Sequence, residues 1–191
     1  YENLPRVLKE RFPLVKDAAD ELLFAHNNSS IRVATSLRSG TIHRLHVSEF
    51  GKICAKYPDK AKEVMTGSIP AVPTNGILII ESTAEGQDGD FYKMTNRAIE
   101  THEAGKDLTP RDYRFHFFPW WDEPGYRIDT ASVPVTPKDK EYFAQVEAET
   151  GTTLDDQQRF WYVATRDADF SGDPEKMWQE YPSTPNEAFQ V

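Results

Sequence analysis

The sequence contains a single cysteine, Cys54, among its 191 residues, and no G-x-x-x-x-G-K-[ST] pattern. One cysteine excludes a disulfide within the chain and is typical of a reducing compartment. Without that pattern, the chain has no phosphate-cradling loop of its own. No apolar run approaches the roughly 18 residues that a membrane-spanning helix requires. The net charge is −9, whereas an autonomous nucleic-acid-binding domain usually carries a basic surface.

The composition nevertheless indicates a folded protein. Hydrophobic residues make up 38% of the chain, aromatic residues make up 12%, and there are four tryptophans. These proportions are not those of a disordered chain. The length suits one domain, or one domain with an appendage. Because the chain begins at Tyr1 rather than Met, within a helix-like pattern, we expect it to be a piece of a longer protein.

Strand-like patterns dominate before about residue 120, and helix-like patterns dominate after it. This order predicts an α/β layer structure followed by a small helical appendage, with domains at residues 1–121 and 122–191. We expect a hairpin around residues 27–30 and a helix that starts at Thr136-Pro137 and stops at Gly151. The other expected strands are residues 41–48, 77–86 and 113–118, and the other expected helices are residues 59–67, 91–104, 154–168 and 173–181.

Two of the predicted strands end in polar residues. The stretch "RLHVSEF" reaches Ser48-Glu49 without a turn residue, and "ILIIEST" reaches Ser82-Thr83. The four consecutive aliphatic residues of the second stretch predict a strand that is buried on both faces. The separation of the two strands allows a crossover, so we expect them to be adjacent and parallel. Their carboxyl ends would then line a crevice of the kind in which α/β proteins bind ligands.

A glutamate in that crevice can accept a proton from an attacking water or orient it beside a triphosphate. By the same reasoning, the hydroxyls of Ser82 and Thr83 can hydrogen-bond that water or a γ-phosphate oxygen. The competing interpretation is that Glu49 is an acidic residue at the start of the following helix, where it stabilises the helix dipole. The local sequence leaves both interpretations open.

Four motifs in the same order resemble the ATPase domain of bacteriophage terminase large subunits, the motors that pump DNA into procapsids. They are "RSGTIHRLHVSEFGKI", "AVPTNGILIIESTAEGQDGDFY", "FFPWWDEPGY" and "EYPSTPNEAF", and they span residues 38 to 189. The resemblance implies a truncated P-loop-NTPase-like sheet of the ASCE type flanked by helices, with a Walker B strand that ends at Glu49 as catalytic glutamate. It also implies that Ser82 and Thr83 belong to a coupling motif.

The same resemblance implies ATP and Mg²⁺ as cofactors of the full-length protein, and no tightly bound cofactor for this piece. The implied partners are double-stranded DNA, a portal protein, a small terminase subunit and further copies of the chain in a ring. The implied location is the host cytoplasm, with no membrane. The Walker A loop and the nuclease domain of the family are expected outside residues 1–191, so we expect the piece to be inactive alone.

Two further residues have expected roles in such a site. Ser48 stands where the family's Asp-Glu pair has its aspartate, and its hydroxyl can hold a magnesium-bound water without adding charge. Arg38, in a loop before the Walker B strand, can contact a phosphate or a neighbouring subunit, or be an ordinary exposed loop arginine. His43 and His46 are spaced i, i+3 on a strand, which does not suit a shared metal.

Three readings of the whole chain remain. The first is part of a DNA-packaging ATPase. The second is a non-enzymatic, lid-like module that contacts neighbouring subunits or the portal. The third is a related helicase-type ATPase, against which "EYPSTPNEAF" argues. The aromatic cluster at residues 117–121 can stack nucleic-acid bases, but it favours packing of the helical appendage against the sheet.

Overall fold

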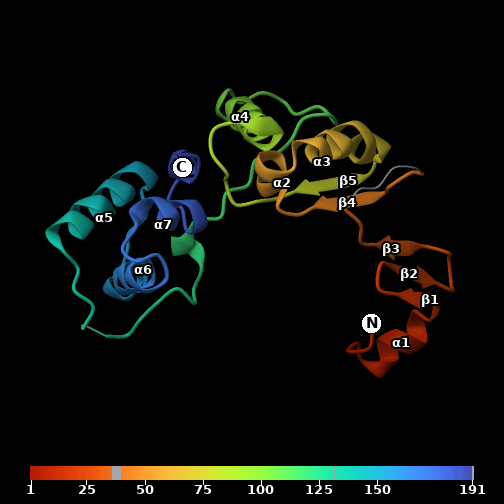
Figure 1. Ribbon diagram of the computed structural model, residues 1–191, viewed down its shortest axis with the longest axis horizontal. Helices are drawn as coiled ribbons and strands as arrows, with labels where there is room; N and C mark the ends of the chain where they lie inside the picture. Colours follow the sequence, from red (N-terminus) through yellow and green to blue (C-terminus); the bar gives the residue numbers. More distant parts are fainter. Residues whose placement is uncertain (36–39, 131, 191) are drawn as a thin grey trace.

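The computed structural model describes residues 1–35, 40–130 and 132–190, and they form a mixed α/β structure extended along one axis (Figure 1). An N-terminal unit, a central sheet with helices and a C-terminal group of helices follow one another along that axis. Arg38 lies outside the described residues. None of the described helices is both long enough and apolar enough to cross a membrane.

The N-terminal unit consists of a short helix and an antiparallel three-stranded sheet. Strands β2 and β3 form the predicted hairpin, and β1 pairs with β2 on its other side. No residue of this unit is buried, and Val15, Ile31 and Val33 are exposed. The elements are α1 (Arg6–Arg11), β1 (Leu14–Ala18), β2 (Glu21–Phe24) and β3 (Ser30–Arg32).

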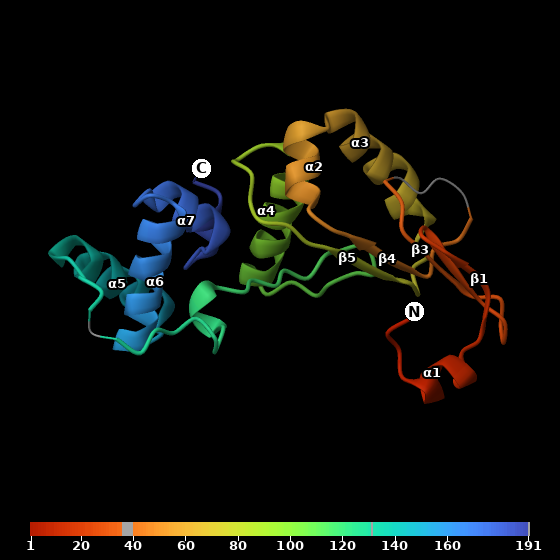
Figure 2. The same ribbon diagram turned by 60° about the horizontal axis from the view of Figure 1, so that its bottom comes forward.

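The central unit is a two-stranded parallel sheet with helices on one face (Figure 2). Its strands are β4 (Arg44–Val47) and β5 (Ile77–Ile80), and its helices are α2 (Phe50–Lys56), α3 (Pro58–Glu63) and α4 (Gly89–Glu103). A π-helical turn at Val64–Ser68 and a 3₁₀ turn at Ile69–Ala71 extend α3. The core residues of this unit are Leu45, Val47, Phe50, Ala61 and Val64.

The prediction that residues 77–86 form a strand buried on both faces is wrong. The strand ends at Ile80, and Ile77 and Ile79 are 49% and 52% exposed. Leu78 and Ile80 point to the other face and pack in the central core. The reason is that helices cover one face of this small sheet, and four aliphatic residues in a row do not indicate how many faces are covered.

The predicted strand at residues 113–118 is also wrong, because this segment has no regular secondary structure in the described chain. Its apolar residues are spaced by two, but no neighbouring strand offers it backbone hydrogen bonds. It runs instead as an extended connection toward the short 3₁₀ turn Trp120–Asp122. A strand is stable only when a partner accepts its ladder hydrogen bonds, and the local sequence does not show whether that partner exists.

The C-terminal unit contains the predicted helices, α5 (Pro137–Thr150), α6 (Asp156–Asp169) and α7 (Pro174–Glu180), followed by a short α8 (Pro185–Ala188). Thr136 and Asp155 begin α5 and α6 with complete capping boxes. Gly151 ends α5 with a left-handed φ of 72°. These signals are local, which is why the sequence predicts these helices well.

The prediction that the aromatic cluster packs the helical appendage against the sheet is wrong for its tryptophans, which pack within the helical unit. Trp120 is 3% exposed, and its ring lies 5.6 Å from Trp161 and 5.0 Å from Tyr162, both on α6. Trp120 and Trp121 therefore pack with the second of the two predicted domains, although the predicted boundary assigns them to the first.

The helical unit contacts the central unit through its last residues. Phe189 is 8% exposed and lies 6.3 Å from Phe91 and 5.1 Å from Tyr92, both on α4. The Gln179 amide donates a hydrogen bond of 3.1 Å to the carbonyl of Ala84. The segment that follows β5 is thus held directly by the C-terminal helices.

Candidate functional site

The carboxyl ends of β4 and β5 lie side by side, as predicted. The strands are parallel, and Val47 is paired with Ile80. Beyond that pair, the Glu81 N–H donates to the Val47 carbonyl at 3.0 Å, and the Phe50 N–H donates to the Glu81 carbonyl at 3.1 Å. These bonds bring the segments that contain Glu49 and Ser82 to the same edge of the sheet.

Glu49 has an unusual backbone conformation at the junction of β4 and α2. Its φ of 57° and ψ of 38° are left-handed, a conformation that costs a residue other than glycine about 1–2 kcal/mol. It occupies the N-cap position of α2, but its side chain makes no capping hydrogen bond. The helix-capping interpretation therefore lacks the hydrogen bond that would support it, although the carboxylate lies near the positive end of the helix dipole.

The Glu49 carboxylate is partly shielded. Its Oε2 atom is inaccessible to solvent and has no hydrogen-bond partner, although 47% of the side-chain surface is exposed. The Lys52 Nζ lies 3.1 Å from Oε2 and forms an ion pair with it. The Glu49 carboxylate is the main cause that raises the pKa of Lys52, and Glu180 and Glu85 raise it further.

Ser82 and Thr83 also carry unpartnered polar atoms at this edge. In the described part of the chain, four buried side-chain nitrogen or oxygen atoms lack a hydrogen-bond partner, and three of them are Glu49 Oε2, Ser82 Oγ and Thr83 Oγ1. The fourth is Arg159 Nε, in the helical unit. An unpaired buried polar group costs about 1–3 kcal/mol, so the two hydroxyls require an explanation, whereas the charge of Glu49 is offset by Lys52.

Gly51 brings α2 against the segment that follows β5. A Cβ atom at position 51 would lie 2.8 Å from the Thr83 carbonyl oxygen and 2.9 Å from Ser82 Oγ. No side chain fits in that space. Sequence reasoning missed Gly51 and Lys52, although the Glu-x-Gly-Lys spacing placed both within one helical turn of Glu49.

The remaining predicted residues lie apart from this cluster or outside the described chain. Ser48 is exposed at the end of β4. His46 points to the exposed face, where its Nε2 lies 3.3 Å from Glu81 Oε1. The described residues contain no group of three or more His, Cys, Asp or Glu side chains placed to hold a metal ion. The role predicted for Ser48 stays a prediction, and Arg38 cannot be placed relative to Glu49.

The cluster can therefore present one shielded carboxylate oxygen and two hydroxyls to a polar ligand, beside one ammonium group. Such a set can hold a water molecule and accept a proton from it, and can hydrogen-bond an anionic oxygen. Comparisons of the chain with models of protein families, with curated proteins and with solved structures found no match.

Proposed function

We propose that this chain is part of the ATPase of a DNA-packaging motor of the terminase large-subunit kind, with a P-loop-NTPase-like core around β4 and β5. The observation that carries the proposal is that three buried oxygens without hydrogen-bond partners belong to the segments that follow the carboxyl ends of two parallel strands. They belong to Glu49, Ser82 and Thr83, the residues to which the terminase resemblance assigns catalysis and coupling.

The physical cost of this arrangement supports a ligand site. The left-handed backbone of Glu49 and the unpaired hydroxyls of Ser82 and Thr83 each reduce the stability of the fold. Such features accumulate where a function requires them, because a bound ligand or water supplies the missing hydrogen bonds. A purely structural strand-to-helix turn would use glycine at position 49 and would pair its hydroxyls.

In the proposed site, Glu49 orients a water molecule and accepts its proton, while Ser82 and Thr83 hydrogen-bond that water or a phosphate oxygen. Ser48 would hold a water bound to Mg²⁺, and Arg38 would contact a phosphate or a neighbouring subunit. ATP would supply the phosphoanhydride bond whose hydrolysis drives DNA movement, and Mg²⁺ would neutralise charge on its phosphates. Glu49, Ser82 and Thr83 are suited to contact the attacking water. The loop and lysine that bind the phosphates would come from another part of the full-length protein.

The partners follow from the same proposal. Double-stranded DNA, a portal protein, a small terminase subunit and further copies of the chain are the partners of a packaging motor. A chain with a net charge of −9 is poorly suited to hold DNA by itself. We therefore assign the main DNA contacts to other parts of the motor.

A second candidate, a lid-like module that contacts neighbouring subunits or the portal, is favoured by the contacts of the C-terminal helices. Gln179 and Phe189 connect those helices to Ala84 and α4, next to the candidate site. When a partner binds the helical unit and moves it, these contacts would transmit the displacement to residues 81–86. This role is compatible with the ATPase and also possible without it.

The substitution Glu49→Gln in the full-length protein tests the proposal. Glutamine keeps the shape of the side chain but cannot accept a proton, so ATP hydrolysis should fall by a factor on the order of 10² to 10⁴ while ATP affinity stays nearly unchanged. Steady-state ATPase rates and nucleotide titrations measure the two effects separately.

The matched control is Glu100→Gln, which makes the same chemical change at an exposed position of α4. It should leave both quantities unchanged. Ser48→Asp, in a separate variant, should make hydrolysis depend more strongly on Mg²⁺ without rescuing Glu49→Gln. Turnover near the wild-type rate in Glu49→Gln would remove the catalytic assignment and leave the lid-like module as the better explanation.

A further inference from the structure

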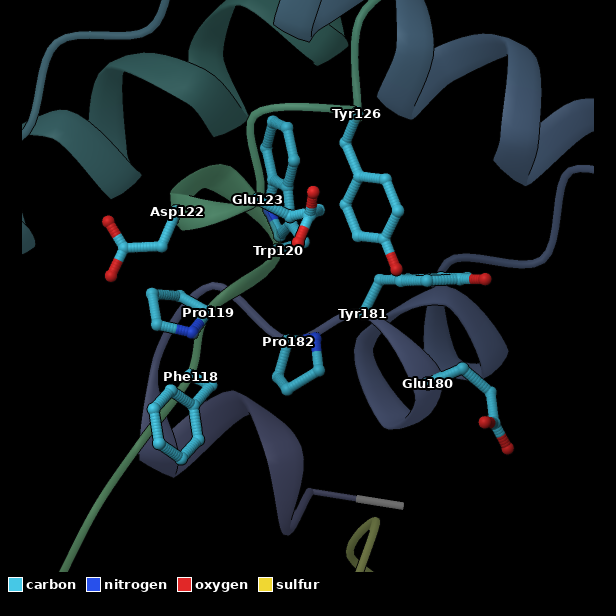
Figure 3. A pocket seen from close by; sticks show the side chains of 9 residues that line it. All are labelled: Phe118, Pro119, Trp120, Asp122, Glu123, Tyr126, Glu180, Tyr181 and Pro182. Atoms are coloured by element: carbon cyan, nitrogen blue, oxygen red, sulfur yellow. The ribbon is translucent and has the colours of Figure 1, made fainter. Parts of the chain in front are cut away.

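A groove of about 300 Å³ lies in the C-terminal unit, between the segment at residues 118–126 and the end of α7. Figure 3 shows its lining, with Phe118, Pro119 and Pro182 on one side and Tyr126 and Tyr181 on the other. None of the residues to which catalysis or coupling is assigned lines it. The groove is therefore separate from the proposed ATPase site.

The aromatic walls of the groove are held in place by the core of the helical unit. The rings of Tyr126 and Tyr181 lie 5.6 Å apart and are perpendicular, at 89°. Tyr126 stacks on Trp161 at 4.1 Å and 5°. Tyr181 meets the same Trp161 edge-on at 5.2 Å. Two fixed, perpendicular aromatic faces form a corner in which a flat or compact group can be enclosed.

Phe118 forms an exposed edge of the same groove. At 81% exposure it is the most exposed large hydrophobic side chain among the described residues. Its ring stacks on the nearby His116 ring, with the two ring centroids 6.4 Å apart. Burial of a phenylalanine normally contributes about 1.5–3 kcal/mol, and this one contributes little of that to the fold. Its exposure is explained if a partner covers it.

The charged residues of the groove all have the same sign. Asp122, Glu123 and Glu180 line it, and no lysine, arginine or histidine does. Among the described residues, none of the three carboxylates forms an ion pair. Glu123 accepts a hydrogen bond from the Gly125 N–H at 3.1 Å, which keeps it near the aromatic walls. The negative faces of the tyrosine and phenylalanine rings add to the negative potential.

We propose that this groove binds an arginine side chain presented by a segment of a partner protein. A guanidinium group is planar and can stack on an aromatic face while its N–H groups pair with carboxylates. The groove offers both kinds of contact, with Tyr126, Tyr181 and Phe118 as faces and the Glu123 carboxylate beside them as acceptor, while the Asp122 and Glu180 carboxylates point outward at its two ends (Figure 3). The chain's net charge of −9 also attracts a basic segment before contact.

Other occupants fit the lining less well. Nucleic acid would bring its phosphates against three carboxylates that no cation of the groove offsets. A neutral proline-rich segment could use the aromatic faces and the prolines, but it would leave the carboxylates without partners. A lysine could pair with one carboxylate, but its ammonium group cannot stack as a plane.

The test is a titration of the 191-residue chain with the blocked peptide Gly-Gly-Arg-Gly-Gly, followed through the four tryptophan indole N–H resonances. The Trp120 indole lies beneath the groove, where its Nε1–H donates to Ser183 Oγ at 2.9 Å. We expect saturable binding with a dissociation constant on the order of 10⁻⁴ to 10⁻³ M. The same peptide with citrulline, which has the shape of arginine but no charge, should bind about tenfold more weakly.

Variants of exposed residues locate the binding without disturbing the fold. Phe118→Ala and Glu123→Gln should each weaken arginine binding by roughly threefold, because one removes an aromatic face and the other the charge of the carboxylate beside Tyr126. Glu149→Gln removes the same charge from an exposed position of α5 outside the groove and should leave binding unchanged. Added salt should weaken binding in the wild-type chain.

Several results would overturn the proposal. Equal binding of the arginine and citrulline peptides would show that charge is not recognised. A proline-rich peptide or a single-stranded oligonucleotide that shifts the Trp120 resonance with higher affinity would assign the groove to that ligand instead. The dispersed indole resonances report whether the chain is folded. If a folded chain does not bind the arginine peptide at several times 10⁻³ M, the groove does not recognise arginine.

Discussion

Glu49 combines two features that an ordinary loop glutamate does not have. Its backbone is left-handed, and its Oε2 atom is shielded from solvent and forms an ion pair with Lys52. Ser82 and Thr83, which are about 30 residues further on in the sequence, complete the cluster of unpartnered oxygens. The left-handed backbone at Glu49 either stabilises the fold or is kept because the carboxylate has a function.

The substitution Glu49→Gly distinguishes these two explanations. Glycine adopts the left-handed conformation without the cost of about 1–2 kcal/mol that glutamate incurs, and its greater freedom in the unfolded chain cancels part of the gain. The exposed ion pair with Lys52 contributes little. We expect the free energy of unfolding to rise by about 0.5–1 kcal/mol, measured by urea denaturation, while the proposed ATPase activity is lost.

The control for this prediction is Glu49→Ala, which removes the carboxylate but keeps a Cβ in the left-handed conformation. It should be less stable than Glu49→Gly. If glycine destabilises the chain as much as alanine does, the backbone at position 49 is not strained, and that part of the argument for a functional site is lost.

At the scale of elements, the site depends on how closely α2 approaches the segment after β5. Gly51 permits this approach, since a Cβ there would meet the Thr83 carbonyl and the Ser82 hydroxyl at less than the usual contact distance. The approach keeps the two hydroxyls beside the start of α2. The sheet below them has two strands, and it relies on this helix to cover one face.

We expect Gly51→Ala to lower the free energy of unfolding by about 1–2 kcal/mol. Overpacking costs about 1–3 kcal/mol, and the better helix propensity of alanine recovers up to about 1 kcal/mol. Chemical denaturation measures the loss. Gly125→Ala is the control, because its Cβ would meet only the flexible Glu123 carboxylate at 3.3 Å. A Gly51→Ala chain more stable than wild type would mean that α2 can move away from Ser82 without cost.

At the scale of the whole molecule, a buried hydrogen-bond network joins segments that are far apart in the sequence. The Tyr142 hydroxyl on α5 donates to Glu187 Oε1 at 2.6 Å and shares a hydrogen bond of 2.8 Å with Ser183 Oγ. Ser183 Oγ also accepts from Trp120 Nε1, and the Ser183 N–H donates to Glu187 Oε2. Two of the four recognised motifs, "FFPWWDEPGY" and "EYPSTPNEAF", thus meet in one network.

Glu187 makes the stability of this network depend on pH. Burial is the main cause that raises its pKa above 4.5, and hydrogen bonds from Tyr142 and Ser183 offset part of that effect. The folded state therefore retains a proton that the unfolded state has already lost. Stability from this group is highest below pH 4.5, falls as the pH rises through the raised pKa, and is constant above it.

The substitution Tyr142→Phe should lower the free energy of unfolding by about 1.5–3 kcal/mol at a pH above the raised pKa of Glu187, because a buried carboxylate then loses a donor. The loss should be smaller near pH 4.5, where Glu187 is protonated and needs fewer donors. Urea denaturation at both pH values measures the difference. Tyr57→Phe, at a tyrosine that is 62% exposed, is the control and should show no loss at either pH. Equal losses for Tyr142→Phe at both pH values would show that the contribution of the Tyr142 hydroxyl to stability does not depend on the charge of Glu187.

The sequence alone determined the features that depend on neighbouring residues. Thr136-Pro137 and Gly151 predicted the ends of α5, because capping and left-handed turns are set within a few residues. The hairpin of β2 and β3 followed from the turn residues between them. The parallel pairing of β4 and β5 was predicted correctly because both strands are apolar and separated by enough chain for a crossover.

Only the tertiary structure decided which faces are covered and which polar atoms have partners. Ile77 and Ile79 are exposed because helices pack on one face of the sheet, and residues 113–118 form no strand because no neighbour pairs with them. Likewise, the unpartnered oxygens of Ser82 and Thr83 and the fixed corner of Tyr126 and Tyr181 depend on contacts between distant segments. Burial and hydrogen bonding are properties of those contacts, and a local sequence pattern does not contain them.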